Sequence, residues 1–138
     1  MAEKVIHITE YDNRRLRDLL IDAEYSDYRG SEYLSDLEKE LDRAMVVDPK
    51  KVPPDVVTMN SKVRLEDLEL GEEMVYTLVF PEEADLSQNK ISILAPIGTA
   101  MLGYRVGDTF EWHVPEGISK MKIKEIIYQP EASGDYNL

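Results

Sequence analysis

The chain has 138 residues, a formal net charge of −12, 43% hydrophobic and 32% charged residues, and no cysteine. The lack of cysteine excludes a disulfide framework and a cysteine-based zinc site. No apolar run reaches the roughly 18 residues that a membrane-spanning helix needs, and residues 1–7 lack the apolar core of a signal peptide. We therefore expect a cytoplasmic protein without membrane contact.

The acidic charge is spread along the chain, with a net −6 in residues 1–48 and −6 in residues 49–138. No basic patch stands out, so direct nucleic-acid binding is disfavoured, because it depends on neutralising phosphates with Lys and Arg. The acidic charge has two interpretations. It can steer the chain toward a partner with a basic surface, or it can serve only to keep the protein soluble.

The first third of the chain has the pattern of two helices. A short extended piece leads to Thr9 and Asp12, which form a capping pair for a helix over residues 11–23. Residues 24–30 break the pattern, and Ser31 can cap a second helix. Two one-sided apolar stripes predict an antiparallel helical hairpin, a short coiled coil with arms of about 20–25 Å. The stripes are Leu16, Leu19, Leu20 and Ala23, then Leu34, Leu37, Leu41, Ala44 and Met45.

A proline-rich stretch follows the predicted hairpin. Pro49, Pro53 and Pro54 favour a semi-rigid boundary over a flexible linker. We therefore expect a helical hairpin in residues 1–48, a boundary in residues 49–54 and a second domain in residues 55–138.

The second domain is predicted to be mainly β-structure. A compact apolar segment at residues 97–102 lies between Pro96 and Gly103, which suit the start and the stop of a short helix. An acidic loop is expected at residues 81–89. The domain is predicted to be α+β, with a mainly antiparallel sheet wrapped on the short helix. Its β-type runs are residues 55–65, 74–80, 91–94, 109–114 and 121–128.

The chain lacks the common catalytic motifs. It has no glycine-rich phosphate-binding loop, no GxGxxG and no serine in a nucleophile elbow. His7 and His113 are far apart in sequence, and we interpret them as packed or surface residues. Two histidines without cysteine also give a transition metal little to bind. No catalytic residue, metal site or cofactor is therefore predicted.

Three acidic residues are predicted at the hairpin tip. Asp22, Glu24 and Asp27 lie in or next to the loop between the helices. Clustered carboxylates can hold Mg²⁺, which prefers oxygen ligands. Alternatively, the tip is only solvated, and its charge matters when it enters a basic channel.

Residues 91–103 read ISILAPIGTAMLG, and Gly107 and Asp108 follow shortly after. This long, ordered pattern resembles the C-terminal domain of the GreA/GreB transcription elongation factors, which act on bacterial RNA polymerase. Within that family the chain looks most like Rnk, the short-hairpin branch named for regulation of nucleoside diphosphate kinase. Residues 40–44, 55–61 and 128–136 carry this second likeness, so the resemblance covers nearly the whole chain.

The resemblance implies a helical hairpin followed by a domain like the FK506-binding proteins (FKBP-like). It also implies docking on bacterial RNA polymerase, at the rim of the secondary channel. The docking residues of the family map to Leu94, Ala95, Pro96 and Ile97. Longer relatives often have Asp-Ser before the proline where this chain has Leu-Ala, so the polar part of that contact differs here.

The length of the predicted hairpin separates this chain from longer family members. Their helices are about 45 Å long, which brings tip acids to the polymerase active site. Glu24 and Asp27 repeat the spacing of those acids, but arms of about 20–25 Å fall short. We expect a non-enzymatic regulator that competes with Gre-type factors, does not stimulate transcript cleavage and affects nucleoside diphosphate kinase levels indirectly.

Two enzymatic alternatives remain open at this point. A prolyl isomerase would need an apolar pocket lined by aromatic side chains, and the domain offers five such residues, which also suit a core. They are Tyr76, Phe80, Tyr104, Phe110 and Trp112. The other alternative is a true cleavage factor that uses Glu24 and Asp27.

Overall fold

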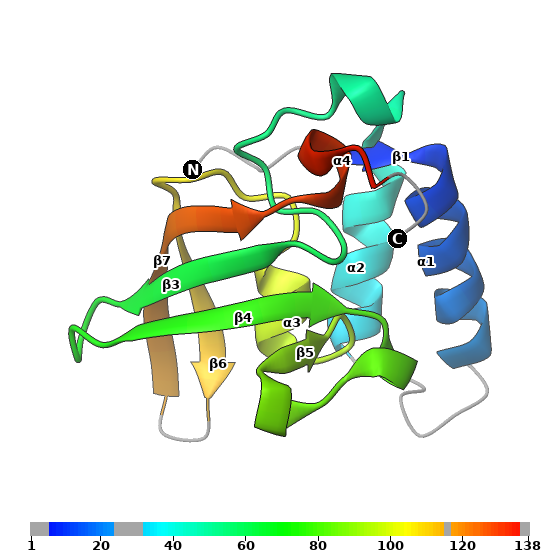
Figure 1. Cartoon of the computed structure of the whole chain (residues 1–138). Coiled ribbons are helices and arrows are strands. Elements are labelled where there is room, and N and C mark those ends of the chain that lie inside the picture. The colour runs from blue at the N-terminus through cyan, green and yellow to red at the C-terminus, as the bar shows by residue number, and fades with distance from the viewer. Residues whose placement is uncertain (1–5, 24–31, 115–116, 136–138) are drawn as a thin grey trace.

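The computed structural model describes residues 6–23, 32–114 and 117–135. It has a helical N-terminal part and a C-terminal β-sheet, so the predicted α+β class is confirmed (Figure 1). The helices α1 (Glu10–Ala23) and α2 (Glu32–Asp42) are flanked by the short strands β1 (His7–Thr9) and β2 (Met45–Val47). In the described residues, no helix is long and apolar enough to cross a membrane.

Helix α1 begins as the sequence predicts. The backbone N–H of Asp12 donates to the hydroxyl of Thr9 at 3.1 Å, which satisfies one free donor of the first turn. The predicted stripe is buried at Leu16 and Leu20, and α2 supplies Leu37 and Leu41 to the same core. The predicted cap at Ser31, the acids Glu24 and Asp27, and the side chains of Ala23 and Leu34 lie outside the described residues.

The prediction for the end of the second helix is wrong. Helix α2 stops at Asp42, and Met45, placed on its stripe by periodicity, is 53% exposed in strand β2. Strand β2 pairs in parallel with β1, and the N–H of Met45 donates to the carbonyl of Ile6 at 2.8 Å. The helix therefore ends before Met45, because the backbone of β2 finds its hydrogen-bond partners in the N-terminal strand β1 and the residue before it.

The C-terminal sheet has five strands in the order β5-β4-β3-β7-β6. Strands β4 and β5 are parallel and the other neighbours are antiparallel, so the predicted mainly antiparallel sheet is confirmed. Helix α3 (Pro96–Met101) covers one face of the sheet (Figure 1). The strands are β3 (Lys62–Asp67), β4 (Glu73–Val79), β5 (Lys90–Ser92), β6 (Thr109–Val114) and β7 (Gly117–Tyr128).

Three strand predictions are corrected. Residues 55–61 form turns and one isolated bridge at Val56, so strand β3 covers only the end of the predicted run. Strand β7 begins at Gly117, four residues before the predicted start, because it also pairs along the full length of β6. Strand β5 ends at Ser92, where the chain turns toward α3.

Further short helices lie in two of the described connections and in the tail. The proline-rich boundary contains the 3₁₀ turn η1 (Pro49–Lys51), and the acidic loop contains η2 (Pro81–Glu83) and η3 (Leu86–Gln88). The tail forms the four-residue helix α4 (Pro130–Ser133).

One hydrophobic core joins the two parts of the chain. Leu16 and Leu37 from the helices share it with Val63 and Leu78 from the sheet and Met101 from α3. Figure 1 shows α2 beside α3, and the two helices are in contact. The helices therefore share the core of the C-terminal part, and α2 packs beside α3. The residue boundaries of the predicted domains stay a prediction.

Candidate functional site

The turn from strand β5 into helix α3 carries the predicted docking residues. The hydroxyl of Ser92 accepts the N–H of Leu94 at 3.0 Å, and the carbonyl of Ser92 accepts the N–H of Ala95 at 3.0 Å. The N–H of Ile93 donates to the carbonyl of Val79 in the neighbouring strand at 2.8 Å. These three bonds satisfy the turn's own donors and fix it to the edge of the sheet.

Helix α3 lies unusually close to this turn. A Cβ atom added at Gly98 would lie 2.2 Å from the carbonyl oxygen of Ser92, so only glycine permits this approach. One residue later, the hydroxyl of Thr99 donates to the carbonyl of Ile93 at 2.6 Å. The small residues of the sequence pattern therefore set the distance between the helix and the turn.

The four predicted docking residues differ in exposure. Leu94 is 5% and Ile97 is 8% exposed, and both belong to the hydrophobic core. Ala95 is half-buried at the core's edge, and Pro96 begins α3, although its side chain lies outside the described part. Of the three described side chains, Ala95 is the one available to a partner, while Leu94 and Ile97 support it from beneath.

The last residues of the sequence pattern, from Gly103 to Asp108, also make specific contacts. Gly103 has φ +88°, and an added Cβ would lie 2.6 Å from the side chain of Ile6, so the pattern's glycine also makes room for the N-terminal segment. The carboxylate of Asp108 accepts the N–H of Arg105 at 2.8 Å, and Arg105 pairs with Asp55 at 2.9 Å. Asp108, which follows Gly107 in the sequence pattern, therefore shapes the turn before β6.

Two of the three segments that suggested the Rnk branch, residues 55–61 and 128–136, contact each other. The hydroxyl of Thr58 donates to the carboxylate of Glu131 at 2.7 Å and lies 2.9 Å from the hydroxyl of Ser61. The side-chain amide of Gln129 donates to the carbonyls of Pro53 and Val56 at 2.8 and 2.7 Å. The tail is thereby fastened to residues 53–61 by buried polar contacts.

Helix α1 adds a buried ion pair to this polar region. Asp12 is 2% exposed and pairs with Arg15 at 2.6 Å, and the Arg15 guanidinium lies over the rings of Tyr11 and Phe80. Burial raises the pKa of Asp12 to about 6, against the lowering effect of Arg15, and the charge of Glu131 adds to the rise. The pair thus connects α1 electrostatically with the end of β4 and with the tail.

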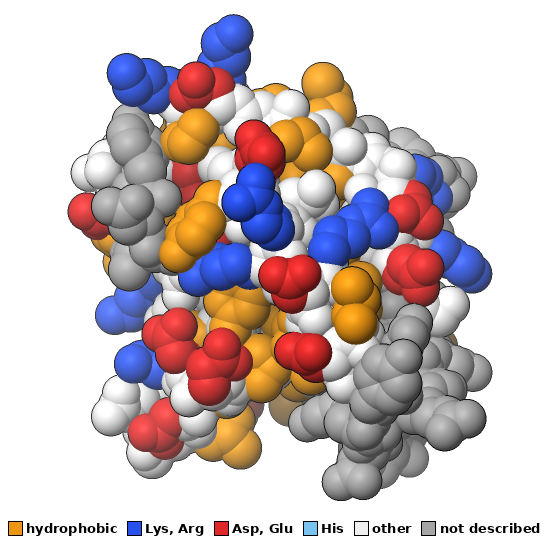
Figure 2. Space-filling view, turned by 90° about the vertical axis from the view of Figure 1, so that its right-hand side faces the viewer, with side chains coloured by type: hydrophobic (Ala, Val, Ile, Leu, Met, Phe, Trp, Pro, Cys, Tyr) orange, Lys and Arg blue, Asp and Glu red, His pale blue; other side chains and the backbone are white. Residues whose placement is uncertain are grey.

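The surface that carries α1 has charges of both signs. Figure 2 shows Lys and Arg side chains interspersed with Asp and Glu on this side of the molecule. Two of its pairs are Arg14 with Glu10 at 3.0 Å and Arg17 with Asp42 at 2.8 Å. Such exposed pairs add little stability.

One of the three predicted tip acids lies in the described part of the chain. Asp22 is exposed near the end of α1, while Glu24 and Asp27 lie outside the described residues. Within the described ranges, no group of three or more Asp, Glu or His side chains could hold a metal ion. Helix α1, with 14 residues, is about 21 Å long, and α2, with 11, about 17 Å.

The described aromatic side chains that could line a prolyl isomerase pocket pack in the core or against one another instead. Phe80 and Phe110 are buried, and Tyr104 stacks on Phe110 with ring centroids 5.4 Å apart. Tyr76 is half-buried against the core, and the side chains of Trp112 and His113 lie outside the described part. Tyr76, Phe80, Tyr104 and Phe110 therefore act as core residues.

Comparison with protein families gives two adjoining matches. Residues 52–128 match the model of the C-terminal domain of transcription elongation factor GreA/GreB, and residues 4–47 match the model of the Rnk N-terminus. The chain is 42% identical to the regulator of nucleoside diphosphate kinase of Escherichia coli K12, over 100% of both chains. It is 37% identical to GreA of Clostridium botulinum Eklund 17B, over 79% of this chain and 71% of that one.

Solved structures support the same relationship. The GreA/GreB elongation factor of Nitrosomonas europaea superposes with a TM-score of 0.76 at 46% identity, covering 89% of this chain and 99% of that one. The Gfh1 structure of Thermus aquaticus has a TM-score of 0.50 at 26% identity, covering 90% and 99%. The observed fold is thus a GreA/GreB-like fold.

Proposed function

The chain belongs to the GreA/GreB family, with the N-terminal region of the Rnk branch, and on this premise we propose that it regulates transcription by binding RNA polymerase. The binding site on the polymerase is the rim of the secondary channel, as the family resemblance implies. The protein competes there with Gre-type factors and does not stimulate transcript cleavage. It works in the cytoplasm, together with the polymerase.

The observation that carries the proposal is the length and position of the helices. At about 21 and 17 Å, α1 and α2 have less than half the reach of the roughly 45 Å arms of longer family members. They also share a core with the sheet, to which α1 and α2 each contribute two buried leucines. A protein of this shape can occupy the channel entrance without bringing acids to the polymerase active site.

The docking edge is Leu94 to Ile97, with Ala95 as its accessible member. The hydrogen bonds of Ser92 and the close approach at Gly98 hold this edge in one conformation, and a preformed edge loses less entropy on binding. The overall acidic charge suits a basic surface on the partner and speeds the encounter.

An effect on nucleoside diphosphate kinase, the enzyme in the name of the Escherichia coli relative, would follow indirectly through transcription. The FKBP likeness and the coiled-coil description remain predictions of the resemblance. Because the four described side chains of the candidate aromatic pocket pack in or against the core, no observation favours prolyl isomerase activity.

A binding titration with core RNA polymerase tests the proposal. Ala95→Arg places a long charged side chain on the docking edge, and we expect at least tenfold weaker binding. Ala132→Arg, at an exposed alanine of α4, is the matched control and should bind like the wild type. Absence of wild-type binding at micromolar concentrations, or equal binding by Ala95→Arg, would contradict the proposal.

A further inference from the structure

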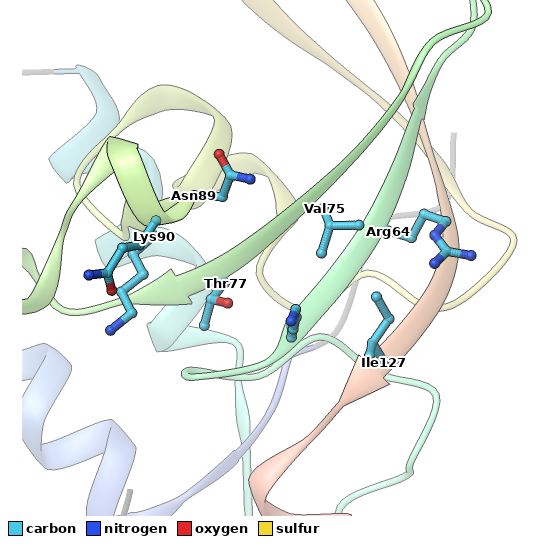
Figure 3. Close-up of a pocket in the computed structure, with 8 residues that line it drawn as sticks. Arg64, Val75, Thr77, Asn89, Lys90 and Ile127 are labelled. Atoms are coloured by element: carbon cyan, nitrogen blue, oxygen red, sulfur yellow. The ribbon is translucent and has the colours of Figure 1, made fainter.

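The face of the sheet opposite α3 contains an open groove of about 500 Å³. Its floor is formed by strands β3 and β4, with β7 on one side and the start of β5 on the other (Figure 3). No described helix covers this face of the sheet (Figure 1). The groove is separate from the docking edge at Ala95 and does not depend on polymerase binding.

The strand register brings basic residues together in this groove. Lys62 is paired with Thr77 across β3 and β4, and Thr77 is paired with Lys90 across β4 and β5. Since neighbouring strands lie about 4.8 Å apart, the Cα atoms of the two lysines are roughly 10 Å apart on one face. Their flexible side chains can therefore reach a single acidic group above the hydroxyl of Thr77.

The two lysines are not engaged in ion pairs within the described part of the chain, although hydrogen bonds from Ser87 and, to a smaller extent, the charge of Lys90 lower the pKa of Asp85. Arg64, two residues after Lys62 on β3, forms ion pairs with Glu125 at 3.2 Å and Glu73 at 4.0 Å. By contrast, neither lysine forms an ion pair with a described residue. Asp85 pairs with Lys90 through the backbone, but its carboxylate accepts the N–H and hydroxyl of Ser87. Lys62 and Lys90 therefore form a local positively charged site in a chain of net charge −12.

The remaining lining favours a peptide over other anions. Val75 and Ile127 give the groove an apolar side, and Ile127 is 42% exposed. A long nucleic acid carries a charge on every phosphate, so the chain's overall negative charge and Glu73 and Glu125 at the groove's end would repel it more strongly than a short peptide with a single carboxylate. A small phosphate ligand usually needs backbone N–H groups from a glycine-rich loop, which the lining residues do not provide.

We propose that this groove binds an extended acidic segment of a partner protein. A carboxylate of the segment lies between Lys62 and Lys90, and a neighbouring apolar side chain packs against Val75 and Ile127. The contact resembles other peptide sites, in which charge fixes the register and small apolar pockets add affinity.

An array of immobilised octapeptides, probed with the full chain, tests this inference. Each peptide places Asp or Glu next to Leu or Ile, and a matched peptide carries Asn or Gln instead. We expect binding of acidic peptides to be at least tenfold stronger than binding of their amide counterparts. Absence of this preference would overturn the proposal.

Charge-reversal variants localise the binding. The double variant Lys62→Glu/Lys90→Glu should lose at least tenfold in affinity, and Lys62→Gln/Lys90→Gln, which only removes charge, should also bind more weakly. The matched control Lys50→Glu/Lys51→Glu changes the net charge equally at two exposed lysines of η1 and should bind like the wild type. Equal losses in the control would show a general charge effect and would contradict a site in the groove.

Two further readouts separate the alternatives. Backbone amide NMR signals of Thr77 and Lys90 should shift when the strongest peptide is titrated into the full chain, and shifts confined to α3 would overturn the proposal. A ten-nucleotide thymidine strand should compete more weakly than the acidic peptide. Stronger competition by the strand would make the groove a nucleic-acid site instead.

Discussion

The hydroxyl of Thr58 donates a hydrogen bond of 2.7 Å to the carboxylate of Glu131, a residue 73 positions later in the chain. Both residues are buried, with exposed fractions of 4% and 8%. The bond joins two of the three segments that carry the likeness to the Rnk branch, residues 55–61 and 128–136. Their first role is therefore structural, because they fasten the C-terminal tail beside the start of the sheet domain.

Removing this bond should destabilise the protein. Thr58→Val keeps the side-chain shape but deprives the buried carboxylate of Glu131 of a donor, at an expected cost of about 1–3 kcal/mol in the free energy of unfolding. Urea unfolding measures this cost. Thr109→Val, at an exposed threonine of β6, should cost much less, and equal losses in the two variants would contradict the account.

The buried carboxyl of Asp12 should make stability depend on pH. Burial raises its pKa from 3.8 to about 6, so the folded protein binds the proton more tightly than the unfolded chain does. The resulting stabilisation is present in full below pH 3.8 and is lost as the pH rises through 6. A pKa difference of this size corresponds to about 3 kcal/mol.

The Asp12→Asn variant isolates this effect. Its free energy of unfolding, relative to the wild type, should rise by up to about 3 kcal/mol between pH 3.5 and pH 7, because the variant has no proton to lose. Asp18→Asn, at an exposed residue of the same helix, serves as the control and should show a much smaller change. A constant difference between Asp12→Asn and the wild type would count against the assignment.

Gly98→Ala should reverse the usual effect of alanine in a helix. In an ordinary helix interior, alanine is favoured over glycine by about 1 kcal/mol. Here the new Cβ would lie 2.2 Å from the carbonyl oxygen of Ser92, and we expect a net loss of about 1–3 kcal/mol in thermal or urea unfolding. A gain in stability would show that the helix and the turn can move apart freely.

Local sequence signals predicted most of the elements but not the contacts between distant segments. The apolar spacing of Leu41, Ala44 and Met45 continued a helical stripe, yet the chain left the helix at Asp42 to pair with β1. Periodicity carries no information about such a partner. Helix α4 did have a local signal, with Pro130 at its first position and the left-handed Gly134 at its end.

The run predicted as a strand from Asp55 shows a second kind of limit. Its β-branched composition favours a strand, but Thr58 and Ser61 hydrogen-bond to each other, and Asn60 adopts φ +66°. Side chains of this kind can draw the backbone into turns instead. The burial of Glu131 left no local signal, because it depends on Thr58 and on the fold as a whole.

The sequence pattern identified the residues of the candidate docking edge, and the burial of their side chains in the structure narrows which of them a partner can contact. The sequence pattern could identify residues 94–97 as a group, but it could not show that Leu94 and Ile97 point into the core while Ala95 stays accessible. The groove with Lys62 and Lys90 had no sequence signal at all. Its charged row exists only because three strands align in one register.

Transcript cleavage in stalled elongation complexes tests the central claim most directly. Added alone, the protein should produce no cleavage above background, because its helices are too short to reach the active site. Added to complexes with GreA, it should reduce GreA-stimulated cleavage in proportion to its concentration, and Ala95→Arg should weaken that effect at least tenfold. Cleavage by the protein itself that disappears in the Glu24→Ala/Asp27→Ala variant would contradict the account.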